Sequence, residues 1–382
     1  VNNSTTSTIS GAITDGASAA NLVKAQSGIL TISGNNTFTG STAVNAGTLK
    51  IVNDDPTAYL AATSGITGSG SLTIESAGSN FSSAISTTKI NGTLTDLTIG
   101  KSGNTQTINL SNDITTTSDQ RYNGPVVLSG GNRTLTAGTS SDNIFFESTV
   151  DSDGTARSLT VSAGTNSGGV ITFTGVVGGN SELSGLTSDS NLFKASSNIT
   201  LAGLLDVDIY SNSQSSNYGI AGGILDGSTS ASFSKGGASN RWLEVYGNNN
   251  YTGPTTVKAG YLRITNDSPH SFLNNTTITG PGHLQIRPNS TNFASVLSMS
   301  DINFTGTSIG KLYIGRSGTN TKFVLDEDID VNGEEIHFYM PVELNGGDRD
   351  IKTTNSHVRF YQTIDSDGTA RALTVTNGTG DT

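Results

Sequence analysis

The chain has no cysteine and only two methionines. The absence of cysteine excludes disulfide bonds, thiolate nucleophiles and thiolate metal ligands. Charged residues are scarce at 13% of the chain, and 20 basic residues are outnumbered by 31 acidic ones, which gives a net charge of −11. Nucleic acids and anionic lipids attract clusters of lysine and arginine, so neither is expected as a partner.

Long hydrophobic runs are also missing. No apolar stretch approaches the roughly 18 residues that a membrane-spanning helix needs, so we expect no membrane insertion by this segment. Only 33% of the residues are apolar, which supplies a thick globular core poorly, and the polar residues are mainly Gly, Ser, Thr and Asn. Charged disordered chains have a different composition. Because Val1 opens directly into polar sequence without a signal-peptide pattern, we interpret the chain as a segment of a longer protein.

A long internal duplication organises the sequence. Residues 30–165 recur in order at 243–379, and residues 166–242 join the two copies. Two pairs of segments show the repeat best: Gly34–Gly40 with Gly247–Gly253, and Asp151–Arg157 with Asp365–Arg371. An enzyme rarely needs its sequence twice, whereas a structure that works by being long gains from each added unit. The duplication therefore favours a surface or scaffold protein.

A finer repeat of three residues, apolar then variable then apolar, runs through both copies. Examples are Leu30-Thr31-Ile32, Leu49-Lys50-Ile51 and Leu243-Glu244-Val245. This alternation is typical of half-buried strands. The spacing from Leu30 to Leu49 is that of a β-solenoid, whose coils contain about twenty residues, and about 18 such coils stacked at ~4.8 Å would extend on the order of 85–90 Å. We therefore predict an all-β fold, a parallel β-helix (β-solenoid), as one continuous segment over residues 1–382.

An alternative fold and two local features remain to be considered. A string of β-sandwich modules is the rival fold, but a sandwich repeat of about 100 residues does not match the observed periods.

The best helical candidate is Ala17–Lys24, where we expect at most a short helix. The recurrent Asn36 and Asn249 are interpreted as turn or ladder residues.

Residues Ser27–Leu49 resemble the passenger-associated transport repeat, which is also called the autotransporter-associated β-strand repeat. The second copy, Tyr246–Ile264, is similar but has Pro254 after the glycine and Tyr261 before the leucine. Two further stretches, Val150–Thr165 and Gly168–Gly179, resemble recurring segments of filamentous-haemagglutinin-like surface proteins. The resemblance implies a right-handed parallel β-helix in a secreted passenger that is displayed on the outer membrane of a Gram-negative bacterium. It also implies adhesion, aggregation or help with export, and it carries over no catalytic residues.

Paired aspartates before a glycine suggest one candidate metal site. Asp151-Ser152-Asp153-Gly154 and its second copy at Asp365–Gly368 could contribute oxygen ligands to Ca²⁺. Two acids are too few for an EF-hand loop, and Ser162 and Thr376 stand where its bidentate glutamate would be. An ordinary Asp-Gly turn is the alternative, and we predict no metal site and no cofactor.

An acidic run is the place to look for catalysis. Its members are Asp326, Glu327, Asp328, Asp330, Glu334 and Glu335. Polysaccharide-degrading β-helix enzymes use paired carboxylates as acid and base, but alternating acids on one strand also make a solvated edge. The four histidines, His270, His283, His337 and His357, have no ligand spacing. We predict no catalytic residues.

Aromatic residues of the second copy are the candidate contact site. Trp242, Glu244 and Tyr246 should face away from the core if Leu243 and Val245 face inward, and outward aromatics can stack on a sugar or anchor a protein contact. The first copy has Ile29 and Ser33 instead of Trp242 and Tyr246. The alternative is that Trp242 covers a coil junction or lies under a loop.

These observations favour a non-enzymatic segment of an extracellular bacterial surface protein, a β-helical stalk or adhesin. Its expected partners are a host or bacterial cell surface, through a glycan or protein ligand. A self-assembling filament or sheath subunit and a polysaccharide-degrading enzyme are the alternatives.

Overall fold

A computed structural model describes residues 1–166, 168–210, 218–303, 309–331, 333, 335–354 and 356–377. The end of the second copy, residues 378–379, lies outside them. The chain divides into two units, Val1–Ser197 (unit 1) and Asn198–Thr382 (unit 2). Parallel strands stack as a β-solenoid, with about 15 turns along the chain and only 4% of residues in helices. The predicted all-β solenoid is confirmed.

Unit 1 contains one long parallel sheet and three shorter ones. The long sheet has the order β1 (Ser7–Ile9), β3 (Ile29–Ile32), β5 (Thr48–Val52), β7 (Ser71–Glu75), β10 (Leu97–Ile99), β13 (Gln120–Tyr122), β16 (Ile144–Phe146), β19 (Val170–Phe173) and β21 (Leu192–Ala195). The shorter sheets contain β2 (Leu22–Lys24), β4 (Thr42–Val44) and β6 (Ile66–Thr67); β8 (Ile85–Ser86), β11 (Ile108–Leu110), β14 (Val126–Leu128) and β17 (Val150–Ser152); and β9 (Thr93–Leu94), β12 (Ile114–Thr116), β15 (Arg133–Thr136), β18 (Arg157–Ala163) and β20 (Leu183–Ser190).

Unit 2 is built in the same way. Its long sheet has the order β24 (Gly219–Ile220), β27 (Trp242–Val245), β29 (Tyr261–Thr265), β31 (His283–Arg287), β33 (Lys311–Ile314), β36 (Glu335–Phe338) and β39 (Val358–Phe360). The other strands are β22 (Ile199–Leu201), β23 (Leu204–Ile209), β25 (Ile224–Asp226), β26 (Ser232–Gly237), β28 (Thr255–Val257), β30 (Ile278–Thr279), β32 (Leu297–Ser298), β34 (Phe323–Leu325), β35 (Ile329–Val331), β37 (Val342–Leu344), β38 (Arg349–Thr353), β40 (Ile364–Ser366) and β41 (Leu373–Asn377).

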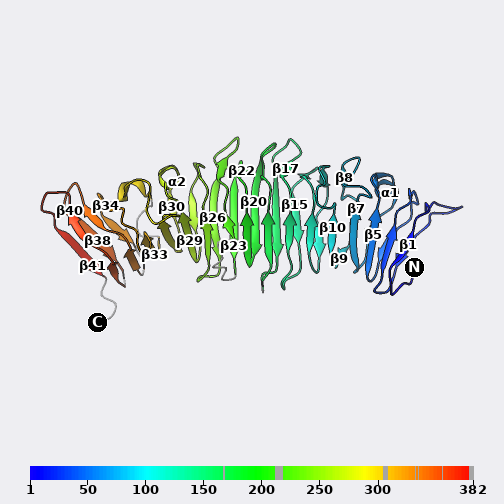
Figure 1. Cartoon of the computed structure of the whole chain (residues 1–382), viewed down its shortest axis with the longest axis horizontal. Helices are drawn as coiled ribbons and strands as arrows, with labels where there is room; N and C mark the ends of the chain where they lie inside the picture. The colour runs from blue at the N-terminus through cyan, green and yellow to red at the C-terminus, as the bar shows by residue number, and fades with distance from the viewer. Residues whose placement is uncertain are drawn as a thin grey trace. The chain divides into compact units, whose positions relative to one another are not determined.

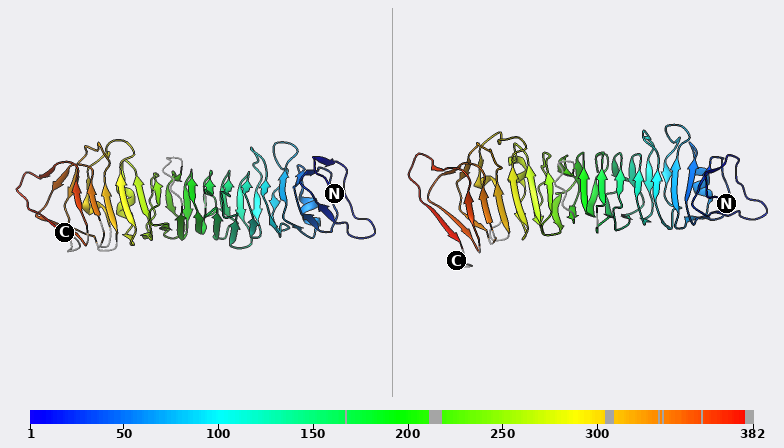
Figure 2. Two further views of the ribbon diagram at one scale, coloured as in Figure 1. Left: turned by 90° about the horizontal axis from the view of Figure 1, so that it is seen from below. Right: turned by 60° about the horizontal axis from the view of Figure 1, so that its bottom comes forward.

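Register in the long sheets follows the sequence triplets. Strands β1, β5, β7 and β10 of unit 1 follow one another along the sheet in Figure 1, with β3 between β1 and β5, and the two views of Figure 2 show the same succession of coils. Leu30 pairs with Leu49 on the next coil, whereas His283 pairs with Lys311, which lies clearly farther along the chain. The sequence overestimates the number of coils because many coils are longer than the one from Leu30 to Leu49.

The core is a narrow interior between the sheets. Leu30 and Ile32 are completely buried, and Thr31 between them is partly exposed. Aromatic rings stack inside unit 1 along successive coils, with ring centroids 5.3 Å apart for Tyr122 and Phe146 and 4.7 Å apart for Phe146 and Phe173. Such rings fill the interior with few apolar residues per coil, which explains how a chain that is only 33% apolar forms a core.

Each copy contains a short α-helix, at the equivalent position of the repeat. They are α1 (Thr57–Ala62) and α2 (His270–Asn275), and a short 3-10 helix, η1, covers Met299–Asp301. The expected helix at Ala17–Lys24 is wrong, because Leu22–Lys24 forms strand β2 and pairs with β4. Pro56 and Pro269 precede α1 and α2, so proline at the helix start was the available signal. None of the helices in the described residues has the length and apolar character needed to cross a membrane.

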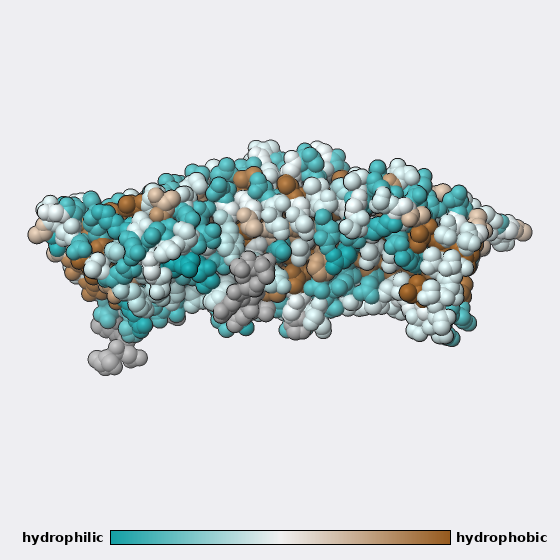
Figure 3. Space-filling model, viewed as in Figure 1, coloured by the Kyte–Doolittle hydropathy of each residue, from teal (hydrophilic) through white to brown (hydrophobic). Residues whose placement is uncertain are grey.

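Buried polar side chains repeat between the copies as well. Asn36 accepts a hydrogen bond from the Ile13 backbone N–H at 2.9 Å, and Asn249 accepts one from the Ile224 backbone N–H at 2.8 Å. Each asparagine also donates to the carbonyl two residues before it, Gly34 or Gly247. Both therefore hold their own turn and link it to the preceding coil, in agreement with their interpretation as turn or ladder residues. The visible surfaces are mostly hydrophilic or neutral, with scattered hydrophobic residues (Figure 3).

Candidate functional site

Trp242 is the first residue of strand β27, and Tyr246 directly follows its last residue. Leu243 and Val245 point inward and are 2% and 0% exposed, so Trp242 lies on the outward side of the strand, as the alternation predicts. The guanidinium of Arg263 lies 4.3 Å from the centroid of the Trp242 ring. Arg263, on the neighbouring coil, therefore covers part of the Trp242 ring and fixes its orientation, and Trp242 stays at the surface.

Glu244, between the two aromatics, is buried although it points outward. It is only 8% exposed, because Arg263 and Arg287 of the next two coils close over its carboxylate. Burial alone would raise the pKa of Glu244, but the hydrogen bond from Thr265 and the two guanidinium charges outweigh it and lower the pKa. Burial, with the negative charge of Glu244, raises the pKa of Tyr246 to about 12.

Two outward columns of side chains continue this cluster across unit 2, and we call them the ladder face. The parallel register aligns Trp242, Tyr261, His283, Lys311 and Glu335 in one column, and Glu244, Arg263, Gln285, Tyr313, His337 and Arg359 in the other. The corresponding column of unit 1 is Thr8, Thr31, Lys50, Thr73, Thr98, Arg121, Phe145, Thr172 and Lys194. Rings and paired charges of unit 2 therefore replace the threonines that prevail in unit 1.

Contacts along the ladder face orient its polar groups. The rings of Tyr313 and His337 stack with centroids 4.6 Å apart, and the Tyr313 hydroxyl donates to Glu335 at 2.6 Å. Burial lowers the pKa of His337, although the charge of Glu335 acts against this shift. Stacked rings cover each other's faces, so the ladder face offers ring edges, hydroxyls and charged groups to a ligand. Sequence reasoning found Trp242 and Tyr246 but missed the columns, which only the register reveals.

The acidic run does not form a carboxylate pair on one strand. Asp330 lies on β35, whereas Glu335 lies on β36 of the long sheet. Asp326 accepts hydrogen bonds from the Ser300 backbone and hydroxyl at 3.0 and 2.6 Å, and Asp328 accepts one from the Asp350 backbone. The expectation of alternating acids on one strand is therefore wrong, because Asp326 and Asp328 precede β35 and Glu335 lies on β36. Glu334 lies outside the described residues.

The Asp-Ser-Asp-Gly segments form turns that an arginine closes. Arg157 donates to Asp153 at 3.0 and 3.2 Å, and Arg371 donates to Asp367 at 3.2 and 2.9 Å. These bonds hold the pKa of each aspartate at about 2, and the glycine after each has φ of +90°. Within the described residues, no three His, Asp or Glu side chains gather as metal ligands.

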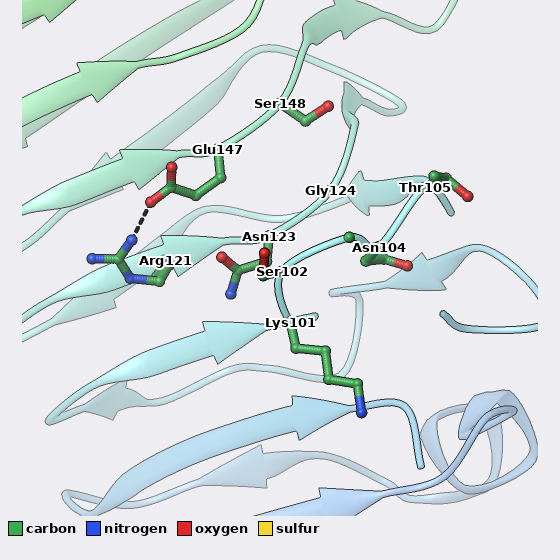
Figure 4. A pocket seen from close by; sticks show the side chains of 10 residues that line it. Lys101, Ser102, Asn104, Thr105, Arg121, Asn123, Gly124, Glu147 and Ser148 are labelled. Atoms are coloured by element: carbon green, nitrogen blue, oxygen red, sulfur yellow. Dashed lines mark hydrogen bonds and ion pairs between the residues drawn. The ribbon is translucent and has the colours of Figure 1, made fainter. Parts of the chain in front are cut away.

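A polar pocket of about 500 Å³ opens in unit 1, where β10, β13 and β16 of the long sheet end. Figure 4 shows Arg121 and Glu147 reaching toward each other from neighbouring strands, and Lys101 extending toward the preceding coil. Arg121 and Glu147 form an ion pair, and the Arg121 guanidinium also lies 4.0 Å from the centroid of the Phe145 ring. No local sequence pattern indicates this pocket, because loops of three coils form it.

One segment in each of the two units matches a known protein family. Residues 22–51 and 243–264 match the model of the passenger-associated transport repeat. The first segment runs from β2 into β5 of unit 1, and the second runs from β27 into β29 of unit 2. The second segment includes Tyr246 and begins one residue after Trp242. A comparison with curated proteins and with solved structures gives no match. The resemblance read from Ser27–Leu49 and Tyr246–Ile264 is confirmed, and this repeat is one of autotransporter passengers.

Proposed function

We propose, from two passenger-associated transport repeats on a β-solenoid, that this chain is a non-enzymatic segment of an autotransporter passenger. It is displayed on the outer membrane of a Gram-negative bacterium and acts as a stalk or adhesin that presents or spaces adhesive regions. The observation that carries the proposal is that both matched segments coincide with regular coils of parallel strands. The repeat family is one of passengers, which implies extracellular display, and its repeats are generally non-enzymatic.

The mechanical role rests on the hydrogen-bond ladders within each unit. Successive coils of each long sheet pair in parallel register, so stretching a unit would break several backbone hydrogen bonds at once. Polar Thr, Ser, Asn and Gly residues prevail outside, which limits nonspecific adhesion. One continuous solenoid over residues 1–382 stays a prediction.

Electron microscopy of the purified chain tests the architecture of this proposal. Single elongated particles support a stalk. Ordered polymers would support the alternative of a filament or sheath subunit, and two separately moving bodies would contradict the continuous solenoid. Antibody labelling of intact cells that produce the parent protein tests display, since an intracellular epitope would overturn it.

Adhesion is proposed to involve the ladder face around Trp242 and Tyr246. Aromatic side chains and arginine are enriched where proteins bind other proteins and where rings contact sugars, and here Arg263 holds Trp242 in place. The ligand is a glycan or protein on a host or bacterial cell. The first copy offers a matched control, because Ile29 occupies the position of Trp242 and is 39% exposed.

Binding of beads coated with the purified chain to cells tests this contact. Trp242→Ala should lower the number of bound beads, whereas Ile29→Ala should leave it unchanged. Circular dichroism of each variant checks that the strands are intact. An equal effect of both substitutions, or none from Trp242→Ala, would exclude the ladder face as the contact site. Sugar release from polysaccharides that disappears in Asp326→Asn and Asp328→Asn variants would instead support the enzyme alternative.

A further inference from the structure

The pocket of unit 1 carries a local charge opposite to that of the chain. Lys101, Arg121 and Glu147 line it and together contribute one net positive charge at neutral pH, whereas the whole chain carries −11. The ammonium of Lys101 makes one long hydrogen bond, 3.3 Å to the Ala77 carbonyl. Because an ammonium has three donors, Lys101 retains donors for a ligand.

Rigid neighbours hold the remaining walls. The buried Asn104 side chain donates to the Gln106 carbonyl at 3.0 Å, and Asn123 donates to the Gly100 carbonyl at 3.1 Å. A Cβ atom on Gly124 would lie 2.3 Å from Nδ2 of Asn104, so the wall requires glycine there. The pocket is thus open at this wall because Gly124 has no side chain and packs against the side-chain amide of Asn104, which its hydrogen bond fixes.

The second copy has larger side chains at the equivalent positions. Met340 stands for Gly124, and Gln362 stands for Ser148. Gln362 donates to the carbonyls of Thr319 and Tyr339 at 2.7 and 2.8 Å, which bridges the two loops that correspond to the pocket walls. Tyr339 and Tyr361, in place of Asn123 and Glu147, stack with centroids 4.5 Å apart. The arrangement of small and charged residues is therefore specific to the first copy.

We propose that this pocket binds a pyranose sugar that carries a carboxylate, such as a uronic acid residue of a polysaccharide. Lys101 exchanges its long hydrogen bond to the Ala77 carbonyl of the preceding coil for an ion pair with the sugar carboxylate. Glu147, which Arg121 holds in position, accepts hydrogen bonds from ring hydroxyls, and the rim hydroxyls of Ser102 and Ser148 complete the polar contacts. Its volume of about 500 Å³ accommodates one or two sugar residues. This site goes beyond the contact proposed on the ladder face and does not depend on it.

Isothermal titration calorimetry of the full chain with oligogalacturonate and with neutral oligogalactose tests the proposal. Oligogalacturonate should bind at least about tenfold more tightly than the neutral oligomer, because the neutral oligomer has no carboxylate to form an ion pair with Lys101. Lys101→Gln should weaken oligogalacturonate binding by about tenfold or more. Added salt should weaken binding to the original chain more than to this variant.

Two further variants distinguish the pocket from the rest of the surface. Ser148→Gln introduces the side chain that bridges the loops in the second copy and should abolish binding while the strands stay intact by circular dichroism. Arg316→Gln, at the second-copy position of Lys101, should leave the affinity unchanged. Equal affinity for the neutral oligomer, no loss with Lys101→Gln, or the same loss with Arg316→Gln would overturn the proposal. A bead-binding defect of Trp242→Ala alone would not affect it.

Discussion

Lys235 provides a test of how the buried polar groups control stability. Its ammonium is completely buried in unit 2 and donates to the carbonyls of Arg241 and Ala259 at 2.9 and 2.8 Å. Burial lowers the pKa of Lys235 from 10.5 to about 8, and the charge of Asp208 opposes part of this shift. In the unfolded chain the same side chain is solvated and has its ordinary pKa.

The direction of the pH effect follows from these two pKa values. Between pH 8 and 10.5 the unfolded chain binds more protons than the folded protein, so the contribution of Lys235 to the free energy of unfolding rises with pH in this window. Each pH unit contributes about 1.4 kcal/mol, so an increase from about pH 8 to about pH 9.5 should add about 2 kcal/mol. Tyrosines act in the opposite direction above pH 10, because burial raises the pKa values of Tyr59 and Tyr246 to about 12.

Urea unfolding at several pH values up to about 9.5, below the tyrosine range, measures this effect. The fluorescence of Trp242, the single tryptophan, reports on the strand next to Arg241. Lys235→Met removes the titration, so the free energy of unfolding of the original chain should gain about 2 kcal/mol over this variant between the two pH values. Lys50→Met, which removes a surface ion pair with Glu75, is the control and should keep the original slope.

The slope remains informative even if Lys235→Met is destabilised at every pH. The two carbonyls left without their donor should cost about 1–3 kcal/mol each, which shifts the curve without tilting it. Lys235→Arg keeps a charge that does not titrate in this range and serves if the methionine variant fails to fold. The reasoning is refuted if the original chain and the folded variant show the same pH slope.

Three further predictions concern other contacts. Phe146→Ala should lower the free energy of unfolding by about 3–5 kcal/mol, because it removes a completely buried ring between Tyr122 and Phe173, whereas Phe145→Ala on the outward side should cost clearly less in urea unfolding. Asp153→Asn should remove a stabilising contribution that is present above pH 4 and fades as the pH falls toward 2, since Arg157 lowers the pKa of Asp153 in the folded protein; acid unfolding curves check this, and an unchanged curve would contradict it. Arg263→Ala should uncover the ring of Trp242, so acrylamide should quench its fluorescence more strongly, and unchanged quenching would argue against this cover.

The long sheets were predictable from sequence because their signal is local. In triplets such as Leu30-Thr31-Ile32 the buried and exposed positions alternate within three residues, and the same alternation placed Leu243 and Val245 inside. The strand β2 was missed because Leu22–Lys24 ends in a lysine, which burial against backbone carbonyls of Gln26 and Ala46 accommodates. That partner set is visible only in three dimensions.

The contact surfaces depended on information that no local pattern contains. Glu244 meets Arg287 from two coils away, and the unequal lengths of the coils hide this alignment in the sequence. The pocket of unit 1 depends on glycine and serine at Gly124 and Ser148, where the absence of side-chain volume matters. Small residues are common throughout this chain, with 47 glycines, so their position carried no distinct signal.

The alternation in the long sheets also separates two evolutionary constraints. Inward positions such as Leu49 and Leu262 fill the interior of a coil. The residues between them, such as Lys50 and Arg263, lie on the outward side and contact side chains of adjacent coils. Selection can therefore replace outward residues coil by coil without disturbing the interior. The two copies have diverged in this way, so that their outward side chains differ on coils whose interiors pack alike.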